Sequence, residues 1–467
     1  MSEYEVFNPT NNPCRGEVYL PGDKSISQRA VILAAMAEGT SHIYGCSNAE
    51  DVMSVVKAMM RLGAQVTYEP SKNNPRDNVD LTITGWGAGG PSQPEFPIDC
   101  GNSATCARVT MGVLTPYDIE VIFDGDESLH HRPFMRVVDP LMQMGAQFKV
   151  LDRAHGSGPQ RSTLPLRITG TSDASAIYYE MPVASSQVKA SILFAGCNCE
   201  GDTIVTEPYQ SRDHSELLLK AFGAEVDIDK ENLMVTLHGP AHLHACDIHV
   251  PGDISSASYF VIAAALVPGS KVVVKDVSIN PTRMGFVRAL QEMGAKIKTK
   301  PVDADDDRNF GGEPVGDIKV KYAGRLDAIQ VTPDKIPQLV DEVPILAFAA
   351  ACAEGDSVFY GVKELKLKET NRIHATADGL NRLGTKAEDK NDNLFVVGGI
   401  DIEGKTTIYP SDDVVELKNY GDHRLAIISA LAGYCGFKPV KMNDVGVAKI
   451  SYPHFFEDIE RLTSGAQ

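Results

Sequence analysis

Two kinds of apolar pattern alternate along this chain. Small apolar residues run from Ala30 to Ala37, and a similar run spans 261–267. Runs of this kind are typical of a helix that is buried on most sides. Short stretches at 65–68 and 81–84 are rich in residues that favour β-structure and predict strands. The pattern therefore predicts an α/β protein.

Glycine marks the end of a second set of predicted helices. A helix predicted from about Ala49 to Leu62 ends at Gly63, and a strand follows. Glycine just past the last apolar helical residue is the usual stop signal. The same order of helix, glycine and strand returns at Gly145, Gly223, Gly294 and, less closely, Gly384.

The start of the first buried helix recurs in the second half of the chain. Pro21-Gly22-Asp23 precedes the first run, and Pro251-Gly252-Asp253 precedes the other, 230 residues later. Four looser copies begin near residues 99, 181, 341 and 420. Internal repeats determine architecture, so we expect six β-α-β-α-β-β units, three in each half.

Three polar runs rich in Gly and Pro, at 70–78, 152–165 and 302–316, predict exposed loops between strands. The last run contains Asp303, Asp305, Asp306 and Asp307. Its spacing lacks the central glycine and terminal glutamate of a calcium-binding EF-hand loop, so we expect a solvated acidic loop.

Length and composition narrow the class of protein. A chain of 467 residues suits two domains, and 43% hydrophobic content suffices for two cores. A net charge of −18 argues against nucleic acid or an anionic membrane as partner. The nine cysteines show no zinc-site spacing. The N-terminal residues lack the pattern of a signal peptide, and no apolar run reaches membrane-spanning length. We therefore expect a soluble cytoplasmic protein.

Cations and hydroxyls gather where the repeated helices begin. Lys24, Ser25 and Arg29 lie at the first helix start, where free N–H groups attract anions. An ordinary capped surface helix would give the same local pattern. The recurrence favours a pocket for a small, multiply anionic substrate, in which two carboxylates, Asp341 and Glu369, could act as general acid or base.

Three further stretches add to this set. Arg132 is expected just before a helix opened by Pro133, and Ser185 to Lys189 in the first turn of another helix. Lys368 and Arg372, four residues apart, are expected on one helical face. Metal-ligand spacing, a P-loop and a dinucleotide fingerprint do not occur in the sequence, which predicts chemistry without a metal or cofactor.

Eight motifs in order closely resemble the family of 5-enolpyruvylshikimate-3-phosphate synthases, also called 3-phosphoshikimate 1-carboxyvinyltransferases. The motifs cover nearly the whole chain: Pro-Gly-Asp-Lys-Ser-Ile-Ser-Gln-Arg (21–29), Gly-Asn-Ser-Ala-Thr (101–105), Gly-Asp-Glu-Ser-Leu-His-His-Arg-Pro (125–133), Ala-Ser-Ser-Gln-Val-Lys (184–189), Ser-Arg-Asp-His-Ser-Glu (211–216), Asp-Glu-Val-Pro-Ile-Leu (341–346), Lys-Glu-Thr-Asn-Arg-Ile (368–373) and Gly-Asp-His-Arg-Leu-Ala (421–426).

The resemblance implies a two-domain enolpyruvyl transferase-like α/β fold with a substrate cleft between the domains. Residues 22–250 would form one domain of three repeats, and residues 1–21 with 251–467 would form the other. The chain would cross between the domains near Pro21 and near Pro251.

The reaction implied is transfer of the enolpyruvyl group of phosphoenolpyruvate to the 5-hydroxyl of shikimate 3-phosphate, with release of phosphate. Asp341 would be the base on the hydroxyl, and Glu369, helped by Lys24, the proton donor to the methylene carbon. Shikimate 3-phosphate would be held by Lys24, Ser25, Arg29, Ser185, Ser186, Gln187, Ser211, Asp341 and Lys368. Phosphoenolpyruvate would be surrounded by Lys24, Ala104, Arg132, Gln187, Arg372 and Arg424.

Two positions depart from the family pattern. Many members have glycine where this chain has Ala104, and the added methyl group should narrow the phosphoenolpyruvate site and exclude the longer inhibitor glyphosate. We therefore expect a glyphosate-tolerant enzyme. Near the C-terminus Ile450 stands where many members have a binding lysine, so Lys449 is left out of the predicted site.

Two alternatives remain at this point. The related enolpyruvyl transferase that acts on UDP-N-acetylglucosamine typically has Lys-Asn in place of Lys24-Ser25 and a mobile-loop cysteine, whereas Cys100 and Cys106 are expected to be structural. A non-catalytic anion-binding paralogue is the other alternative, and the intact Lys24, Asp341, Glu369 and Arg424 argue against it. The expected partners are the two substrates alone, bound by a monomer.

Overall fold

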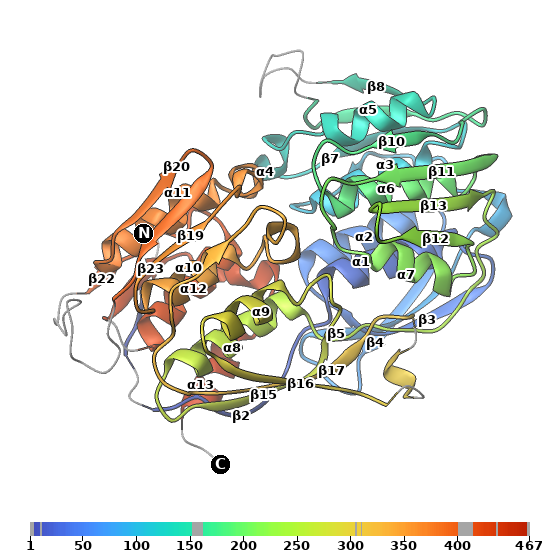
Figure 1. Ribbon diagram of the computed structural model, residues 1–467. Helices are drawn as coiled ribbons and strands as arrows, with labels where there is room; N and C mark the ends of the chain where they lie inside the picture. The colour runs from blue at the N-terminus through green and yellow to red at the C-terminus, as the bar shows by residue number, and fades with distance from the viewer. Residues whose placement is uncertain are drawn as a thin grey trace. The chain divides into compact units, whose positions relative to one another are not determined.

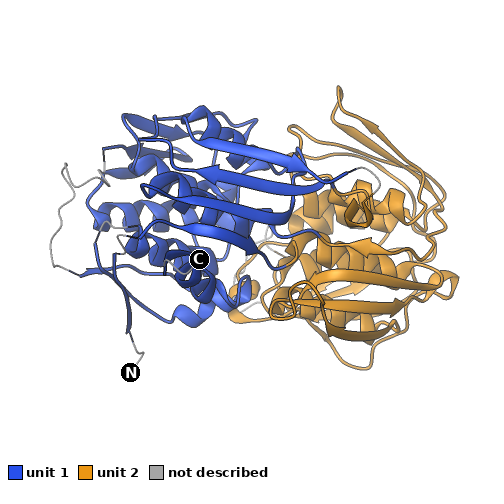
Figure 2. Cartoon of the chain, turned by 90° about the horizontal axis from the view of Figure 1, so that it is seen from below, with its two compact units in different colours: residues 1–21, 251–304, 314–467 blue, residues 22–250, 305–313 orange. Residues whose placement is uncertain are grey.

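The computed structural model describes residues 4–9, 12–151, 162–303, 306–309, 311–399, 414–435 and 438–464. The chain forms two compact units, shown in separate colours in Figure 2. Unit 1 comprises residues 1–21, 251–304 and 314–467, and unit 2 comprises residues 22–250 and 305–313. Each unit has a hydrophobic core of its own.

Three four-stranded sheets belong to unit 2. Their strand orders are β14-β3-β5-β4, β6-β7-β9-β8 and β10-β11-β13-β12. The bounds are β3 Thr40–Ser47, β4 Gln65–Pro70, β5 Asn78–Thr84, β6 Ile98–Asp99, β7 Glu120–Asp124, β8 Gln147–Val150, β9 Leu166–Thr169, β10 Tyr178–Glu180, β11 Gly201–Thr206, β12 Val226–Asp229, β13 Met234–Gly239 and β14 Ile248–His249.

Unit 1 has two four-stranded sheets, β16-β17-β15-β2 and β18-β19-β21-β20, and in its described residues a three-stranded sheet, β1-β23-β22. The bounds are β1 Tyr4–Phe7, β2 Arg15–Tyr19, β15 Lys271–Ser278, β16 Lys296–Pro301, β17 Val315–Lys321, β18 Gln330–Val331, β19 Asp356–Phe359, β20 Ala387–Lys390, β21 Asn393–Val397, β22 Val415–Glu416 and β23 Val440–Asn443.

All six sheets share one pairing rule. In each four-stranded sheet an outer strand pairs parallel with its neighbour, as Ile248 of β14 does with Ile43 of β3, and the other two pairs are antiparallel. The three-stranded sheet has one parallel and one antiparallel pair. In the part of the chain that the structure describes, these six sheets are the structural counterpart of the sixfold repeat in the sequence.

Helices pack against the sheets in both units (Figure 1). In unit 2 they are α1 Lys24–Met36, α2 Glu50–Arg61, α3 Ala104–Leu114, α4 Glu127–His130, α5 Met135–Gln143, α6 Ser186–Gly196 and α7 His214–Ala221. In unit 1 they are α8 Ile254–Leu266, α9 Gly285–Glu292, α10 Val343–Ala351, α11 Arg372–Leu383, α12 His423–Tyr434 and α13 Phe455–Thr463. Among the described residues, short 3₁₀ helices span Gly87–Gly89, Asp307–Asn309, Ile336–Gln338, Lys363–Leu367 and Val445–Ile450.

One helix of each repeat is buried almost throughout. These helices are α1, α3 and α6 in unit 2 and α8, α10 and α12 in unit 1. Their alanine, serine and glycine content lets neighbouring backbones approach closely, because small side chains leave no bulk at the contact. A Cβ built on Gly112 of α3 would lie only 2.1 Å from the main-chain oxygen of Ser191 in α6.

The recurring Pro-Gly-Asp motif begins a buried helix in each unit. The Asp23 carboxylate accepts a hydrogen bond from the main-chain N–H of Ile26, and Asp253 accepts from the N–H groups of Ser255 and Ser256. These are N-cap bonds, which satisfy the free donors at a helix start. The predicted helix starts at both copies are therefore confirmed.

The predicted loops are less exposed than expected. In 70–78, Ser71, Asn74, Asp77 and Asn78 are buried, and Pro70 and Asn78 belong to strands β4 and β5. Some of these buried polar groups have hydrogen-bond partners: Asn74 Nδ2 donates to Asp77, and the Asn78 side chain accepts from the Gly22 N–H.

The other two loops differ from the prediction in the same way. Residues 152–161 of the second loop lie outside the described residues, whereas Thr163 and Leu164 are buried. In 302–316 the residues 304, 305 and 310 also lie outside, so Asp305 is not placed. A 3₁₀ helix and the start of β17 occupy part of that run, and Glu313 is buried there against His214.

Candidate functional site

Unit 2 places Lys24 at the first position of α1, where Asp23 caps the helix. The Lys24 Nζ lies 2.8 Å from a carboxylate oxygen of Asp51, in the first turn of α2, and the Lys24 side chain is 23% exposed. The ion pair fixes the direction of a flexible side chain and leaves part of the ammonium accessible. Asp51 was not among the residues predicted from sequence.

Arg29 connects the starts of two repeats in unit 2. Its Nη1 donates to the Ser25 main-chain oxygen at 3.0 Å, its Nη2 to the Ser186 main-chain oxygen at 3.2 Å, and its Nε to the Ser215 hydroxyl at 2.9 Å. Ser186 is the first residue of α6, and Ser185 caps that helix through the Val188 N–H. Predicted residues from α1 and α6 are thus brought together.

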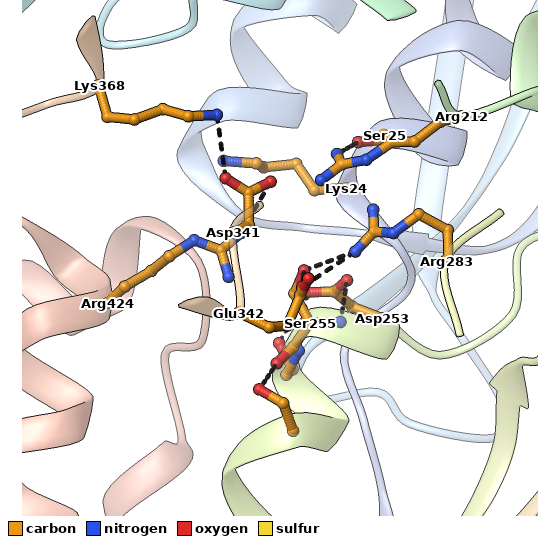
Figure 3. A network of polar contacts seen from close by, with 12 residues as sticks. Lys24, Ser25, Arg212, Asp253, Ser255, Arg283, Asp341, Glu342, Lys368 and Arg424 are labelled. Carbon is orange, nitrogen blue, oxygen red and sulfur yellow. Dashed lines mark hydrogen bonds and ion pairs between the residues drawn. The ribbon is translucent and has the colours of Figure 1, made fainter. Parts of the chain in front are cut away.

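A second arginine shares this cluster. Arg212 Nη1 donates to the Ser25 hydroxyl at 3.2 Å (Figure 3). Burial, and after it the positive charge of Arg212, lowers the pKa of Arg29 to about 10. Two guanidinium groups with hydroxyls between them form a strong attraction for a dianion such as a phosphate ester. Arg212 lies inside a motif quoted above, yet nothing in the sequence indicated that it contacts a residue 187 positions away.

Gln187 is fixed at both ends of its amide. Its Oε1 accepts from Arg108 Nη1 at 2.6 Å, and its Nε2 donates to the Thr105 hydroxyl at 2.8 Å. Arg108 and Thr105 belong to α3, whose first residue is the buried Ala104. The bonds bring Gln187 to the helix start that carries Ala104.

Arg132 lies in a different setting from the one predicted. It follows α4, and α5 begins at Met135, so Pro133 does not open the helix. The reason is that Phe134 takes the N-cap position. Arg132 Nη2 donates to the Asn102 side chain at 3.2 Å, two residues before Ala104. The arginine therefore lies by the α3 start.

Ser211 is held by a buried acid. The Glu207 carboxylate accepts from the Ser211 hydroxyl at 2.6 Å and from its N–H at 2.9 Å. Glu207 and Glu216 also pair with the buried Lys189, at 3.1 and 2.7 Å. Burial alone would lower the pKa of Lys189, but the two carboxylates outweigh it and raise that pKa. Lys189 is therefore a structural cation.

Unit 1 gathers the two predicted carboxylates around one guanidinium. Arg372 Nη1 lies 3.3 Å from Asp341 Oδ1, and Arg372 Nη2 lies 2.5 Å from Glu369 Oε2. Asp341 also pairs with Lys368 at 3.1 Å and lies 3.9 Å from Arg424 (Figure 3). All five unit 1 residues predicted from sequence thus belong to one cluster.

Asp422 fixes Arg372 from the other side. This buried carboxylate contacts Arg372 Nε at 2.7 Å and caps α12 through the N–H of Arg424. Burial alone would lower the pKa of Arg372, but Asp422, Glu369 and Asp341 together raise it. Burial likewise opposes the shift at Arg424, whose pKa is raised most of all by Asp341. Both arginines therefore stay charged across the physiological range.

The predicted helix through Lys368 and Arg372 is wrong. A 3₁₀ helix ends at Leu367, Lys368 has extended backbone angles, and α11 begins only at Arg372. The Asn371 side chain accepts from the His374 N–H as an N-cap, which places the start of α11 at Arg372. Lys368 and Arg372 meet at Asp341 across this turn, and not along a helical face.

The two clusters differ in what they can do. In unit 2 the arginines face hydroxyls and amides, which suits binding of phosphate and carboxylate groups. In unit 1 carboxylates are held by cations, which suits transfer of protons.

Within the described ranges, no group of His, Cys, Asp and Glu is placed to hold a metal ion. Among the described residues no helix is long and apolar enough to span a membrane.

The fold and these clusters define an enolpyruvyl transferase-like protein with two three-repeat units. The family model for EPSP synthase (3-phosphoshikimate 1-carboxyvinyltransferase) matches residues 9–459. The chain therefore belongs to the EPSP synthase family.

Relatives and solved structures agree with this. A 3-phosphoshikimate 1-carboxyvinyltransferase of Sphingopyxis alaskensis is 40% identical over 460 residues, which are 97% of this chain and 96% of the relative. One of Bacillus cereus is 38% identical over 458 residues, 98% of this chain and 99% of the relative.

An EPSP synthase structure from Acinetobacter baumannii is 35% identical, with a TM-score of 0.81 over 99% of this chain and 98% of that one. The enolpyruvyl transferase NikO from Streptomyces tendae has a TM-score of 0.75 over the same shares of the two chains. Its 18% identity supports the fold alone.

Proposed function

We propose that this chain transfers the enolpyruvyl group of phosphoenolpyruvate to the 5-hydroxyl of shikimate 3-phosphate and releases phosphate. The observation that supports it most is the Arg372 guanidinium, which contacts both Asp341 and Glu369. One cation thereby holds a candidate base and a candidate acid in fixed places. Addition followed by elimination across a double bond needs both.

Proton transfer in the addition step is assigned to the unit 1 carboxylates. Asp341 takes the proton of the 5-hydroxyl as that oxygen bonds to C2 of phosphoenolpyruvate. Glu369, with Lys24, supplies a proton to the methylene carbon, which gives a tetrahedral intermediate. Loss of phosphate from C2 and of one methyl proton then restores the double bond, so atoms and charge balance.

Binding of the two anionic substrates is assigned to both clusters. We propose that the phosphate of shikimate 3-phosphate binds where Arg29, Arg212 and Ser25 meet, because two guanidinium groups converge there and charge-assisted bonds to a dianion are strong. The remaining ligands of that substrate are Lys24, Ser185, Ser186, Gln187, Ser211, Asp341 and Lys368. Phosphoenolpyruvate is assigned to Lys24, Ala104, Arg132, Gln187, Arg372 and Arg424.

The proposal includes tolerance of glyphosate. Ala104 is the first residue of α3, is 5% exposed, and is followed by Thr105, which contacts Gln187. A methyl group in so enclosed a place takes up room that glycine would leave for a longer ligand. That the protein is a cytoplasmic monomer remains a prediction from sequence, and light scattering of the purified chain tests its monomeric state.

The experiment that tests the reaction follows both products. The purified chain is incubated with phosphoenolpyruvate and shikimate 3-phosphate, and ³¹P and ¹H NMR monitor inorganic phosphate and the vinyl protons of the product. Equal amounts of phosphate and enolpyruvyl ether are expected. Phosphate without the ether would indicate simple hydrolysis and contradict the proposal.

A further inference from the structure

The residue that follows Asp341 in the sequence belongs to a buried ion pair. Glu342, the next residue, accepts hydrogen bonds from the Ser255 hydroxyl and from Arg283 Nη2, the latter at 3.2 Å. Arg283 also donates to the Ser255 hydroxyl at 2.7 Å. We call Ser255, Arg283 and Glu342 the Glu342 cluster; all three belong to unit 1 and are shown in Figure 3.

The Glu342 cluster is almost fully shielded from water. Arg283 and Glu342 are 1% exposed and Ser255 is 2% exposed. Removing a carboxylate and a guanidinium from water costs more than their attraction usually returns, so such a pair is weak evidence of a stabilising role. The pair is therefore more informative for the parts of the chain that it holds in place.

Ser255 occupies the same place in its repeat as Ser25 does in the first. Each is the third residue after the motif glycine, and each hydroxyl accepts from an arginine, Arg283 or Arg212. In unit 1 the hydroxyl also donates to a carboxylate of the chain itself, Glu342. The arginine and serine that suit an external anion in unit 2 thus bind an internal anion in unit 1.

The internal anion is anchored to a rigid support. Asp253 caps α8 by accepting from the N–H of Ser255, which fixes the backbone that carries the Ser255 hydroxyl. Glu342 is also the N-cap residue of α10, which is buried along its whole length. The main chain at 341–342 is therefore held between two helix starts.

We propose that Glu342 is a positioning residue for Asp341. With its own carboxylate fixed by Arg283 and Ser255, Glu342 sets the main-chain direction from which the Asp341 carboxylate reaches Lys368 and Arg372 at 3.1 and 3.3 Å. The inference rests on the proposed function, in which Asp341 takes the proton of the substrate hydroxyl and contacts that substrate.

The test is a double-mutant cycle between Glu342→Gln and Asp341→Asn. The cycle is measured on the dissociation constant of shikimate 3-phosphate, which needs no turnover, and kcat is measured for the single variants. If Glu342 acts through Asp341, Glu342→Gln lowers kcat by roughly tenfold or more, because small misplacements of a reacting group are costly. It also weakens binding by roughly fivefold, and this effect disappears in the Asp341→Asn background.

Two further variants separate positioning from stability. Ser255→Ala keeps the buried charges paired, and it replaces Glu342→Gln in the cycle should the latter fail to fold. Asp458→Asn is the matched control, since Asp458 is 2% exposed in the same unit and accepts from the Tyr452 hydroxyl at 2.8 Å. It should lower the melting temperature and leave kcat per folded molecule within about twofold of the wild type.

The kinetic and binding results distinguish a positioning role of Glu342 from a purely structural one. Equal effects of the Glu342→Gln or Ser255→Ala change in both backgrounds, or a kcat per folded molecule like that of Asp458→Asn, would overturn the positioning role. A wild-type protein without any enolpyruvyl transfer would instead overturn the proposed function. An active wild type with unaffected variants would overturn the positioning role alone.

Discussion

Lys24 and Asp51 form an ion pair of 2.8 Å at the starts of α1 and α2. Lys24 is assigned to both substrates in the proposed function, so the carboxylate that pairs with it is expected to matter for catalysis. A lysine side chain has four rotatable bonds, and a fixed carboxylate beside it selects one direction for the ammonium.

We expect Asp51→Asn to reduce kcat/KM by about tenfold, because the ammonium loses its fixed direction. Since Asp51 is buried, a loss of stability of about 1–3 kcal/mol is also expected. Steady-state kinetics and thermal unfolding check the two parts. The exposed pair of Lys335 and Glu292, 3.0 Å apart in unit 1, is a control for the loss of an ion pair away from the site, and Glu292→Gln should change neither quantity appreciably. An increase of kcat/KM in Asp51→Asn would show that Asp51 competes with substrate for Lys24.

Ala104→Gly is expected to make the enzyme sensitive to glyphosate. Removing the methyl group opens space at the α3 start beside Thr105 and Gln187. The inhibition constant should fall by at least about tenfold, with a smaller change of KM for phosphoenolpyruvate, since the smaller substrate does not need the space. Inhibition assays at several phosphoenolpyruvate concentrations measure both. Potent inhibition of the wild type by glyphosate, competitive with phosphoenolpyruvate, would contradict the predicted tolerance.

Two helical glycines should respond to alanine in opposite ways. At Gly112 the new methyl group would meet the Ser191 main-chain oxygen at 2.1 Å, so α3 and α6 must separate, and a loss of about 3 kcal/mol or more is expected. Gly379 in α11 has no atom within 4 Å of that position, so Gly379→Ala should gain about 0.5–1 kcal/mol. Denaturant unfolding measures both. Similar stabilities of the two variants would contradict the tight packing of α3 on α6.

The cysteines should react slowly and without loss of activity. Burial raises the pKa of Cys46 and Cys197 to about 12 and that of Cys246, which is half-buried, to about 11. Raised values mean less thiolate at neutral pH: at about pH 8 roughly one part in a thousand of Cys246 is the reactive form. Alkylation should therefore accelerate about tenfold per pH unit up to about pH 11.

Mass spectrometry after iodoacetamide treatment at about pH 8, with activity measured in parallel, checks this expectation. Rapid modification that abolishes activity would point to a reactive cysteine like the one in the alternative family. Loss of activity only after unfolding would agree with cysteines that serve as small core residues.

Local signals predicted most of the helix starts. Asp23 and Asp253 precede buried runs, and the structure shows both as N-caps. The same signal was present at Asn371, but the spacing of Lys368 and Arg372 led to a longer helix than α11. Capping is a bond between near neighbours and is visible in sequence; a pair of charges four residues apart occurs in turns as well as in helices.

Hydrogen-bond partners far apart in the sequence could not be predicted from it. Arg212 bonds to Ser25, and Arg283 bonds to Glu342, although neither arginine was singled out. Asn74 and Asp77 were expected in an exposed loop and are buried. Which polar residues are buried depends on partners that tertiary packing brings together, and composition alone does not identify them.

The most direct test compares acceptors with wild-type protein and with Asp341→Asn. Phosphate release from phosphoenolpyruvate is measured with shikimate 3-phosphate or with UDP-N-acetylglucosamine, in the presence and absence of millimolar glyphosate. We predict that the wild type releases phosphate with shikimate 3-phosphate as acceptor but not with UDP-N-acetylglucosamine, and that glyphosate has little effect. In Asp341→Asn the rate of phosphate release should fall by about a hundredfold or more. Release only with UDP-N-acetylglucosamine, or undiminished release by Asp341→Asn, would contradict the account.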